Sequence, residues 1–224
     1  SELAVPSRRR MALTLAAAAI VIAALSVPAF RYFRGSPDPQ QIQFLVSTPT
    51  VGLSGLHLSI SPDGRWLAFS GFTAGATASN SMLFVRQIDS VAVRSMPGTE
   101  GAQDPFWSSD SRYIGFSAGG KLKKVQVSGG TPEVVANLPS AGGGTWNQDN
   151  VIIFASGNVL YRVSAAGGPA AAITKLDGAQ REVAHLWPYF LPDGQHFLYL
   201  ARSPQSSIFL GSLNSEERTR LLSS

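Results

Sequence analysis

Histidines are the first residues to weigh for catalysis or metal binding, and this sequence has three, His57, His185 and His196. Metal sites hold their ion with His, Cys or carboxylate ligands at short, regular spacings. None of the three histidines stands at such a spacing from another histidine or a carboxylate, so we assign none of them to a metal. The chain has no cysteine, which excludes thiolate metal sites, cysteine nucleophiles and disulfides.

The common catalytic motifs are also missing. The sequence contains no Gly-x-Ser-x-Gly turn of a serine hydrolase and no His-Glu-x-x-His of a zinc peptidase. The glycine-rich stretch 141–144 lacks the Lys and Ser/Thr of a phosphate-binding loop. We therefore predict no catalytic, cofactor-binding or metal-binding residue and no cofactor. We expect that this chain alone is not an enzyme.

Two sets of recurring residues invite a functional interpretation. Four tryptophans could form an aromatic binding surface, but most of them stand at or beside repeated apolar positions, which favours a core role. Four aspartates could suggest calcium, but each lies in a turn of its own, where Asp bonds the local backbone. His196 stands where other copies have Trp66 or Tyr113, so we expect it to pack. The two sets are Trp66, Trp107, Trp146 and Trp187, and Asp63, Asp110, Asp149 and Asp193.

The charge of the chain is unevenly distributed. The 18 Lys and Arg exceed the 14 Asp and Glu, for a net charge of +4 among 224 residues. The whole excess lies in residues 1–34, which contain five arginines and one acidic residue, so the remainder is neutral. A neutral body offers no field for phosphates, and we expect no nucleic-acid partner. The one basic cluster there, Lys121, Lys123 and Lys124, is interpreted as a solvated strand edge.

Residues 11–30 form an uncharged, apolar run, MALTLAAAAIVIAALSVPAF. As a helix, this run would rise about 30 Å, the thickness of the hydrocarbon core of a bilayer. We predict a transmembrane helix at 11–30 that contacts the lipid bilayer, a cytoplasmic juxtamembrane tail at 1–10 and a Pro-containing linker at 31–41. Two alternatives stay open: a cleaved signal peptide with Val27-Pro28-Ala29 at the cut, and a buried soluble helix.

Four segments of the remaining chain can be superimposed. Each has an apolar or aromatic residue three positions before a shared aspartate and an apolar run after it. In two copies the turn reads Pro-Asp-Gly, in which Pro presets φ, Asp bonds the backbone and Gly accepts a positive φ. Each segment is predicted to be a β-hairpin. The segments are 58–70, 105–117, 144–156 and 188–201.

Two more short apolar runs follow each hairpin, which gives four antiparallel strands per repeat of about 40 residues. The strand after the aspartate is apolar almost throughout, as expected when neighbouring sheets cover both of its faces. We predict an all-β fold, a β-propeller of four recognisable four-stranded blades, in a repeat region at 42–224. A β-sandwich contains similar hairpins but does not explain four aligned turns. The blades lie near 56–97, 103–138, 142–176 and 185–224.

The turn Ser61-Pro62-Asp63-Gly64 and the apolar run that ends at Phe69-Ser70 resemble the TolB-type, WD-repeat-like propeller repeats of bacterial proteins. The resemblance covers about residues 42–224, although the second and third copies keep only the aspartate. The order of arginines, membrane helix, linker and repeats is similar to that of membrane-anchored bacterial serine/threonine protein kinases. The stretches 83–86, 96–101 and 120–125 look like those proteins as well. In them a kinase domain precedes the membrane helix, and no kinase motif is present in this sequence.

The resemblance implies a non-catalytic, membrane-tethered sensing or protein-interaction propeller. It would be the extracytoplasmic (periplasmic) part of a single-pass receptor-type serine/threonine kinase in the bacterial cell membrane, with an unknown protein or small-molecule ligand. The alternative is the propeller of a TolB-like envelope translocation protein or of a prolyl-oligopeptidase-type peptidase. We also expect an incomplete propeller, because Ile42–Val46 is an extra apolar strand that further blades would use.

Overall fold

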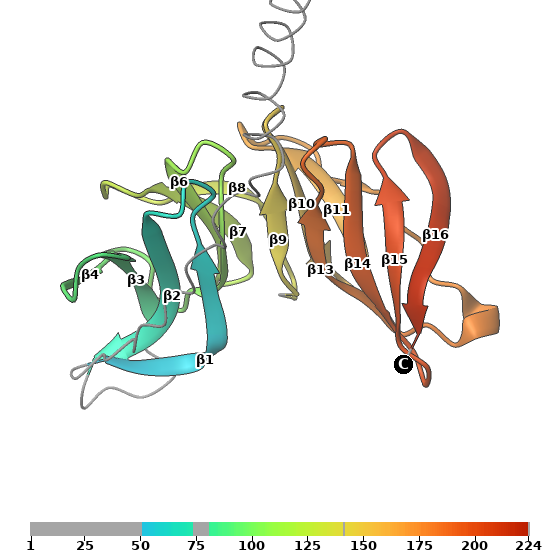
Figure 1. Ribbon diagram of the computed structural model, residues 1–224, viewed down its shortest axis with the longest axis horizontal. Helices are drawn as coiled ribbons and strands as arrows, with labels where there is room; N and C mark the ends of the chain where they lie inside the picture. The colour runs from blue at the N-terminus through green and yellow to red at the C-terminus, as the bar shows by residue number, and fades with distance from the viewer. Residues whose placement is uncertain (1–50, 74–80, 141, 224) are drawn as a thin grey trace, which may run out of the picture. The chain divides into compact units, whose positions relative to one another are not determined.

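The computed structural model describes residues 51–73, 81–140 and 142–223 of the chain. Within these ranges the backbone forms strands β1 to β16 and one short 3-10 helix. The strands make four antiparallel sheets of four strands each, which follow one another in chain order (Figure 1). The all-β architecture and the four four-stranded units predicted from the repeats are confirmed.

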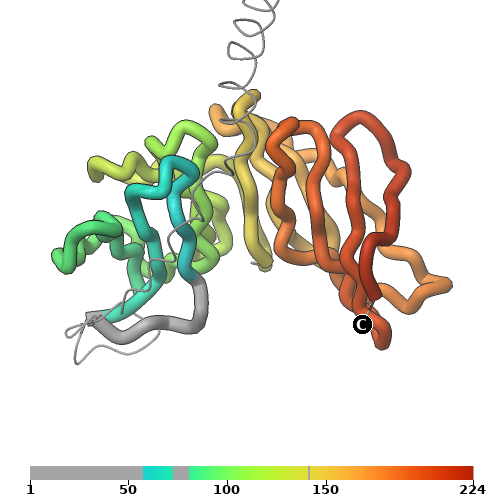
Figure 2. The backbone as a smooth tube through the Cα atoms, viewed as in Figure 1, coloured from blue at the N-terminus to red at the C-terminus, as the bar shows by residue number. Residues whose placement is uncertain are grey.

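Each sheet is a meander in which every strand pairs with the next strand of the chain, a path that can be followed in Figure 2. Sheet 1 contains β1 (Val51–Ile60), β2 (Trp66–Thr73), β3 (Met82–Gln87) and β4 (Val93–Ser95). Sheet 2 contains β5 (Gln103–Trp107), β6 (Tyr113–Ala118), β7 (Lys121–Gln126) and β8 (Glu133–Asn137). Sheet 3 contains β9 (Gly144–Trp146), β10 (Val151–Ser156), β11 (Val159–Ser164) and β12 (Ala171–Ala172). Sheet 4 contains β13 (Ala184–Phe190), β14 (His196–Arg202), β15 (Ser207–Ser212) and β16 (Ser215–Ser223).

The repeated aspartate closes the turn between the first two strands in three of the sheets. Asp63 accepts hydrogen bonds from the Ser61 hydroxyl (2.5 Å) and from the N–H of Arg65 (3.1 Å). Asp110 makes the same pair of bonds within its own turn. Asp193 accepts the backbone N–H groups of Gln195 and His196, and its other oxygen lies 2.6 Å from the ring nitrogen Nδ1 of His196. These bonds lower the pKa of Asp193 to about 2.

The turn of sheet 3 is built differently. There the side-chain oxygen of Asn147 accepts the N–H groups of Asp149 (3.1 Å) and Val151 (2.8 Å). The turn role expected for Asp149 is therefore wrong. Asn147, two positions earlier, replaces it because an amide oxygen satisfies the same backbone donors.

Apolar side chains fill the spaces between successive sheets. Phe116 lies between sheets 1 and 2, Phe106 between sheets 2 and 3, and Phe197 between sheets 3 and 4, all of them buried. The Phe106 ring fits because it packs on two glycines: a Cβ at Gly115 or Gly144 would lie 2.3 or 2.4 Å from a ring atom. Burying one such side chain contributes about 2–3 kcal/mol, so the stacking of sheet on sheet holds the fold together.

Burial along the second strand of each sheet shows which sheets are covered on both faces. Strands β2, β6 and β10 each contain five consecutive buried residues, as their almost continuous apolar sequence predicts. Strand β14 instead alternates, because Leu198 and Leu200 are only partly buried. Leu198 is paired with Tyr189 on one side and Leu210 on the other, so these side chains share the face of sheet 4 that points away from sheet 3.

The lysine cluster does not lie at a sheet edge, and that prediction is wrong. Lys121, Lys123 and Lys124 belong to β7, which is paired with β6 on one side and β8 on the other. The Lys124 ammonium group donates to the backbone oxygen of Ala165 in sheet 3 (2.9 Å) and pairs with Glu133 (3.2 Å). An interior strand accommodates these lysines because their long side chains reach partners beyond it.

Several predictions concern residues outside the described ranges: the tail at 1–10, the membrane helix at 11–30, the linker at 31–41 and the extra strand at 42–46. In the part of the chain that the structure describes, no helix is long and apolar enough to cross a membrane. The predictions for residues 1–46 stay predictions.

Candidate functional site

A cluster of polar side chains lies between sheets 3 and 4. Glu182 precedes β13, His185 lies on β13 and Arg218 lies on β16. One Glu182 oxygen is 3.1 Å from His185 Nε2, and the two Glu182 oxygens are 2.8 and 3.0 Å from Arg218 Nη1. The side chains of Glu182 and His185 are only 2% and 0% exposed. A carboxylate buried this deeply requires such partners, because an unpaired buried charge is very costly.

Asp177 extends the cluster toward solvent. It caps the 3-10 helix η2 (Gly178–Gln180), where its Oδ1 accepts the N–H groups of Ala179 (2.9 Å) and Gln180 (3.4 Å). Its other oxygen lies 3.3 Å from Arg218 Nη2, and its N–H donates to Glu182 (2.7 Å). Two carboxylates and one guanidinium thus attach the segment between β12 and β13 to the last strand of sheet 4.

The pKa values in the cluster follow from burial and from these bonds. Burial lowers the pKa of His185 below its ordinary value, although Glu182 opposes the shift. Burial alone would raise the pKa of Glu182, but hydrogen bonds from the Asp177 N–H, His185 and Arg218 outweigh it and lower that pKa. At neutral pH the cluster therefore holds a neutral imidazole between an ionised carboxylate and a hydroxyl.

The hydroxyl belongs to Thr174, whose Oγ1 is 2.9 Å from His185 Nδ1. Thr174, His185 and Glu182 thus repeat the hydroxyl–imidazole–carboxylate order of a hydrolytic triad. The Thr174 hydroxyl also accepts the N–H of Leu160 (2.9 Å), and Thr99 makes the same bond to the N–H of Leu83 (2.9 Å) in sheet 1, next to no histidine. We conclude that the Thr174 hydroxyl serves to satisfy the N–H of Leu160 on β11 and that the cluster is structural.

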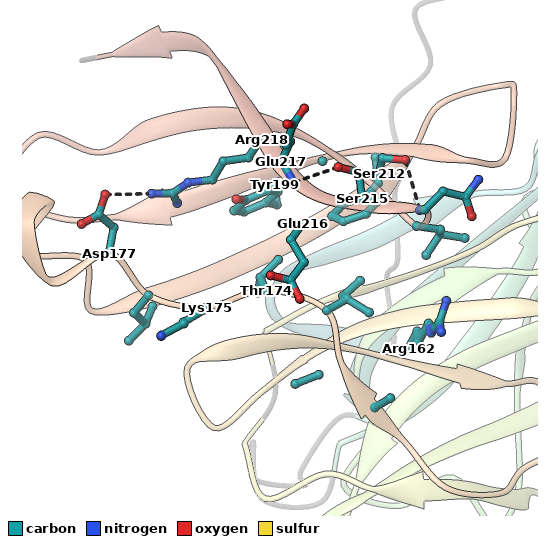
Figure 3. A pocket seen from close by; sticks show the side chains of 18 of the residues that line it. Arg162, Thr174, Lys175, Asp177, Tyr199, Ser212, Ser215, Glu216, Glu217 and Arg218 are labelled. Atoms are coloured by element: carbon teal, nitrogen blue, oxygen red, sulfur yellow. Dashed lines mark hydrogen bonds and ion pairs between the residues drawn. The ribbon is translucent and has the colours of Figure 1, made fainter.

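A pocket of about 890 Å³ opens beside this cluster, and we call it the wedge pocket. One wall comes from Arg162 on β11, from β12 and from the segment that follows β12; the other comes from β14 and from the turn between β15 and β16. Phe197 and Tyr199, both almost fully buried, form its floor. Figure 3 shows Arg162 and Glu216 reaching into it from opposite walls, with the Arg218–Asp177 ion pair at one end.

Two exposed aromatic side chains lie on β13, the first strand of sheet 4: Trp187 is 60% and Tyr189 67% exposed. Trp187 has a φ of +50°, a left-handed conformation that is costly for a bulky residue. The strand is irregular between Leu186 and Tyr189. The Trp187 ring lies against Gly143, where a Cβ would meet it at 3.0 Å.

The left-handed conformation recurs in sheets 2 and 3, and its recurrence separates fold from function. Asp104 (φ +49°) and Gly143 (φ +85°) hold the corresponding places just before Pro105 and Gly144. Three of the four sheets therefore adopt a positive φ at this position, and two of them do so without an aromatic side chain. The indole of Trp187 is therefore not part of the pattern that the repeats share.

The structure corrects several sequence-based assignments. Trp107 and Trp146 are buried as predicted, and Trp66 is partly buried, but Trp187 is exposed, so the core role assigned to the set is wrong for that residue. His196 does not pack in the core: its side chain is 47% exposed and its ring is 2.6 Å from Asp193. His185 and His196 each stand three residues after a carboxylate that they contact, so the statement that no histidine has such spacing is wrong.

The polar cluster was missed because its members are far apart in sequence. Arg218 meets Glu182 across 36 residues, and no local pattern marks that pairing. The spacing of Glu182 and His185 was the one available signal. Among the described residues, no group of three or more His, Asp or Glu side chains could hold a metal ion.

Comparison with solved structures places these sheets in a known architecture. The chain superimposes on TolB from Acinetobacter baumannii with a TM-score of 0.62 at 14% identity, over 75% of this chain and 43% of that one. It superimposes on a putative TolB from Agrobacterium tumefaciens with a TM-score of 0.67 at 16% identity, over 85% of this chain and 71% of that one. For a puromycin-hydrolyzing peptidase from Mycobacterium tuberculosis the TM-score is 0.57 at 14% identity, over 85% of this chain and 32% of the peptidase. The fold is a TolB-like β-propeller.

The four sheets are therefore propeller blades, and the sequence-based resemblance to TolB-type repeats is confirmed at the level of the fold. At identities of 14–16% the likeness concerns the fold alone. The chain spans less than half of the Acinetobacter protein and about a third of the peptidase. No protein-family model and no curated protein matches the sequence.

Proposed function

We propose that this chain is a non-catalytic sensing or protein-interaction propeller, anchored in the bacterial cell membrane by residues 11–30, with its blades outside the cytoplasm. The single observation that carries the binding role is Trp187. A large aromatic side chain occupies a strained, exposed position that Asp104 and Gly143 fill elsewhere without it. Trp and Tyr are the residues most enriched at the energetic centres of protein interfaces.

The surface has the character of an interface anchor. Trp187 and Tyr189 are separated by one buried residue, Pro188, on a paired strand. Gly143 supports the indole from below. A rigid, partly supported aromatic side chain loses little conformational entropy when it is buried by a partner.

For the parent protein we propose a receptor-type serine/threonine kinase whose kinase domain lies outside this chain. The order of arginines, apolar segment, linker and propeller supports this proposal. The second candidate is the propeller of an envelope translocation protein or of a propeller peptidase, and the TolB and peptidase folds favour it. The encoding gene separates the two: a kinase domain before Ser1 supports the first, and a hydrolase domain after Ser224 supports the peptidase.

The binding role is tested by photo-crosslinking in cells that produce the full chain. A photoactivatable amino acid at Tyr189 should give one discrete product, which the additional change Trp187→Gly removes. The same amino acid at Arg112, which is exposed in the turn between β5 and β6, is the control and should not give that product. Glycine suits a positive φ, as Gly143 shows, so Trp187→Gly should unfold at the same temperature or higher. A product of equal yield in Trp187→Gly contradicts the proposal.

The topology and the lack of catalysis have separate tests. Reporters fused after Gly35 should be active when they need export and silent when they need the cytoplasm; the reverse pattern rejects the topology. The purified chain should transfer no phosphoryl group from ATP. Transfer by the chain itself, with contaminating kinases excluded, rejects the non-catalytic role.

A further inference from the structure

The wedge pocket exists because the outer strand of sheet 3 is short and carries small side chains. Strand β12 consists of Ala171 and Ala172 only, and both are exposed. Between sheets 2 and 3 the corresponding outer strand β8 supplies Val135 and Ala136, which are buried in the core there. The space that side chains fill in one gap is left open in the next. A volume of about 890 Å³ is within the range of small-molecule and peptide pockets.

The charges that line the wedge pocket differ between its two walls. Arg162 and Lys175 belong to the sheet 3 side, and Glu216 belongs to β16 on the sheet 4 side. Within the described part of the chain, none of these three side chains makes a hydrogen bond or an ion pair. Arg218 and Asp177, by contrast, are engaged with each other and with Glu182. The carboxylate of Glu217, which also lines the pocket, likewise makes no hydrogen bond or ion pair among the described residues, so the pocket offers two uncommitted cations and two uncommitted anions.

The backbone at the wedge pocket offers a second kind of contact. Strand β12 pairs with β11 on one side and is the outermost strand of its sheet, so its other edge has no strand partner among the described residues. An exposed edge is a template for an added strand. The methyl groups of Ala171 and Ala172 leave that edge open to an approaching backbone.

We propose that the wedge pocket binds a short extended peptide that carries both a free ammonium group and a free carboxylate. The peptide lies along the edge of β12. Its ammonium group faces Glu216, and its carboxylate faces Arg162. Each single charge on the ligand then has an opposite charge on one wall, whereas a purely anionic or purely cationic ligand would meet one favourable and one unfavourable wall.

The probe is tetra-alanine with free termini, titrated into the full chain in detergent micelles near neutral pH and followed by NMR or calorimetry. Saturable binding is expected. The same peptide with an acetylated amino terminus and an amidated carboxyl terminus should bind at least about tenfold more weakly, a loss of about 1.4 kcal/mol. Equal binding of the two peptides, or no binding of the uncapped one at millimolar concentration, overturns the proposal.

Variants separate the charges from the backbone contact. Arg162→Gln and Glu216→Gln should each weaken binding of tetra-alanine several-fold, and Arg112→Gln, an exposed arginine outside the pocket, should not. The exchanged pair Arg162→Glu with Glu216→Arg should bind better than either single exchange, because the peptide can then bind in the reverse direction. Failure of that rescue shows that the charges do not act as a pair and contradicts the proposal.

A steric variant gives an independent readout. Ala171→Trp should fill the pocket and abolish binding, whereas Ala170→Trp, exposed and outside the pocket lining, should leave it intact. Both changes lie at exposed positions, so thermal unfolding of the chain should change little. Unimpaired binding in Ala171→Trp overturns the assignment of the site. Trp187→Gly should not change peptide binding, so this inference stands or falls separately from the aromatic surface.

Discussion

The segments that link sheet 1 to sheet 2 and sheet 3 to sheet 4 meet the same structural requirement with different residues. In the first link the N–H of Met96 donates a hydrogen bond to the backbone oxygen of Leu83, and the Thr99 hydroxyl accepts the N–H of Leu83. In the second link the N–H of Ile173 donates a hydrogen bond to the backbone oxygen of Leu160, and the Thr174 hydroxyl accepts the N–H of Leu160. Both links thus close the third strand of their sheet in the same way.

The two links differ in everything beyond that closure. Met96 is 1% exposed and packs into the apolar core between sheets 1 and 2. Ile173 is only partly buried, and the chain then runs through Lys175, Asp177 and Glu182 before it enters β13. These additional residues supply the polar cluster and one wall of the wedge pocket. The comparison teaches that the repeat needs only the closing bonds, so the rest of a link is free to acquire a binding role.

The largest expected difference between the links is in packing. Met96→Ala should lower the free energy of unfolding by about 3 kcal/mol, because it leaves a cavity in a closed core. Ile173→Ala should cost about half as much, since that side chain is only partly buried and lines the open wedge pocket. Thermal unfolding followed by circular dichroism measures both. Equal losses would mean that the two gaps are equally well packed and would break the comparison.

Removing the buried carboxylate should come next in size. Glu182→Ala leaves His185 and Arg218 without their shared partner and should cost roughly 2–3 kcal/mol. Glu100→Ala is the matched change in the first link, where the side chain is exposed and accepts a single N–H from Gly98; it should stay within about 0.5 kcal/mol. If both changes cost the same, the cluster is not what holds the second link.

The two threonines should sharpen the comparison further. Thr99→Val strands the buried N–H of Leu83 and should cost about 2 kcal/mol. Thr174→Val removes the equivalent bond and also the contact of the hydroxyl with His185 Nδ1, but the site lies beside an open pocket, where water can replace the hydroxyl, so about 1 kcal/mol is expected. The difference between the unfolding midpoints of the two variants tests this prediction. A larger loss at Thr174 would instead point to a role of its hydroxyl beyond closure of the sheet.

The smallest expected effect concerns pH. The pKa of His185 is lowered on folding. Below about pH 6.5 this imidazole therefore binds a proton more readily in the unfolded chain than in the folded chain. Stability should therefore fall as the pH drops through 6.5. The lowered pKa of Glu182 adds a further loss of stability below about pH 4.5, the ordinary pKa of a glutamate. His185→Gln should flatten the dependence between pH 6.5 and 5, and an unchanged slope in this variant would reject the assignment.

The sequence predicted the regular part of the fold because each repeat contains its own local signals. Turns such as Ser61–Gly64 and apolar runs such as Trp66–Phe69 need only neighbouring residues to be interpreted. The same reasoning failed where a repeat position carries an atypical residue. The core role expected for Trp187 is wrong because sequence alone does not show that β13 is irregular at that point, or that its side chain is exposed.

The cluster between sheets 3 and 4 could not be predicted, for a different reason. Glu182 and Arg218 are brought together by the packing of β16 against the preceding link, a contact between residues 36 apart. The wedge pocket depends on the absence of side-chain volume at Ala171 and Ala172, which has meaning only once the neighbouring sheet is in place. Local patterns define the strands, and the contacts between sheets define the site.

The alternating burial of β14 also bears on the order in which the molecule opens. Sheets 2 and 3 are held by apolar contacts on both faces, whereas among the described residues sheet 4 has a well-buried face only toward sheet 3. Regions with fewer buried contacts open with lower free energies. The backbone amides of β15 and β16 should therefore exchange with deuterium earlier than those of β6 and β10. Since β16 also carries Arg218 and Glu216, the motion that exposes these amides would widen the wedge pocket and set how quickly a ligand enters and leaves it.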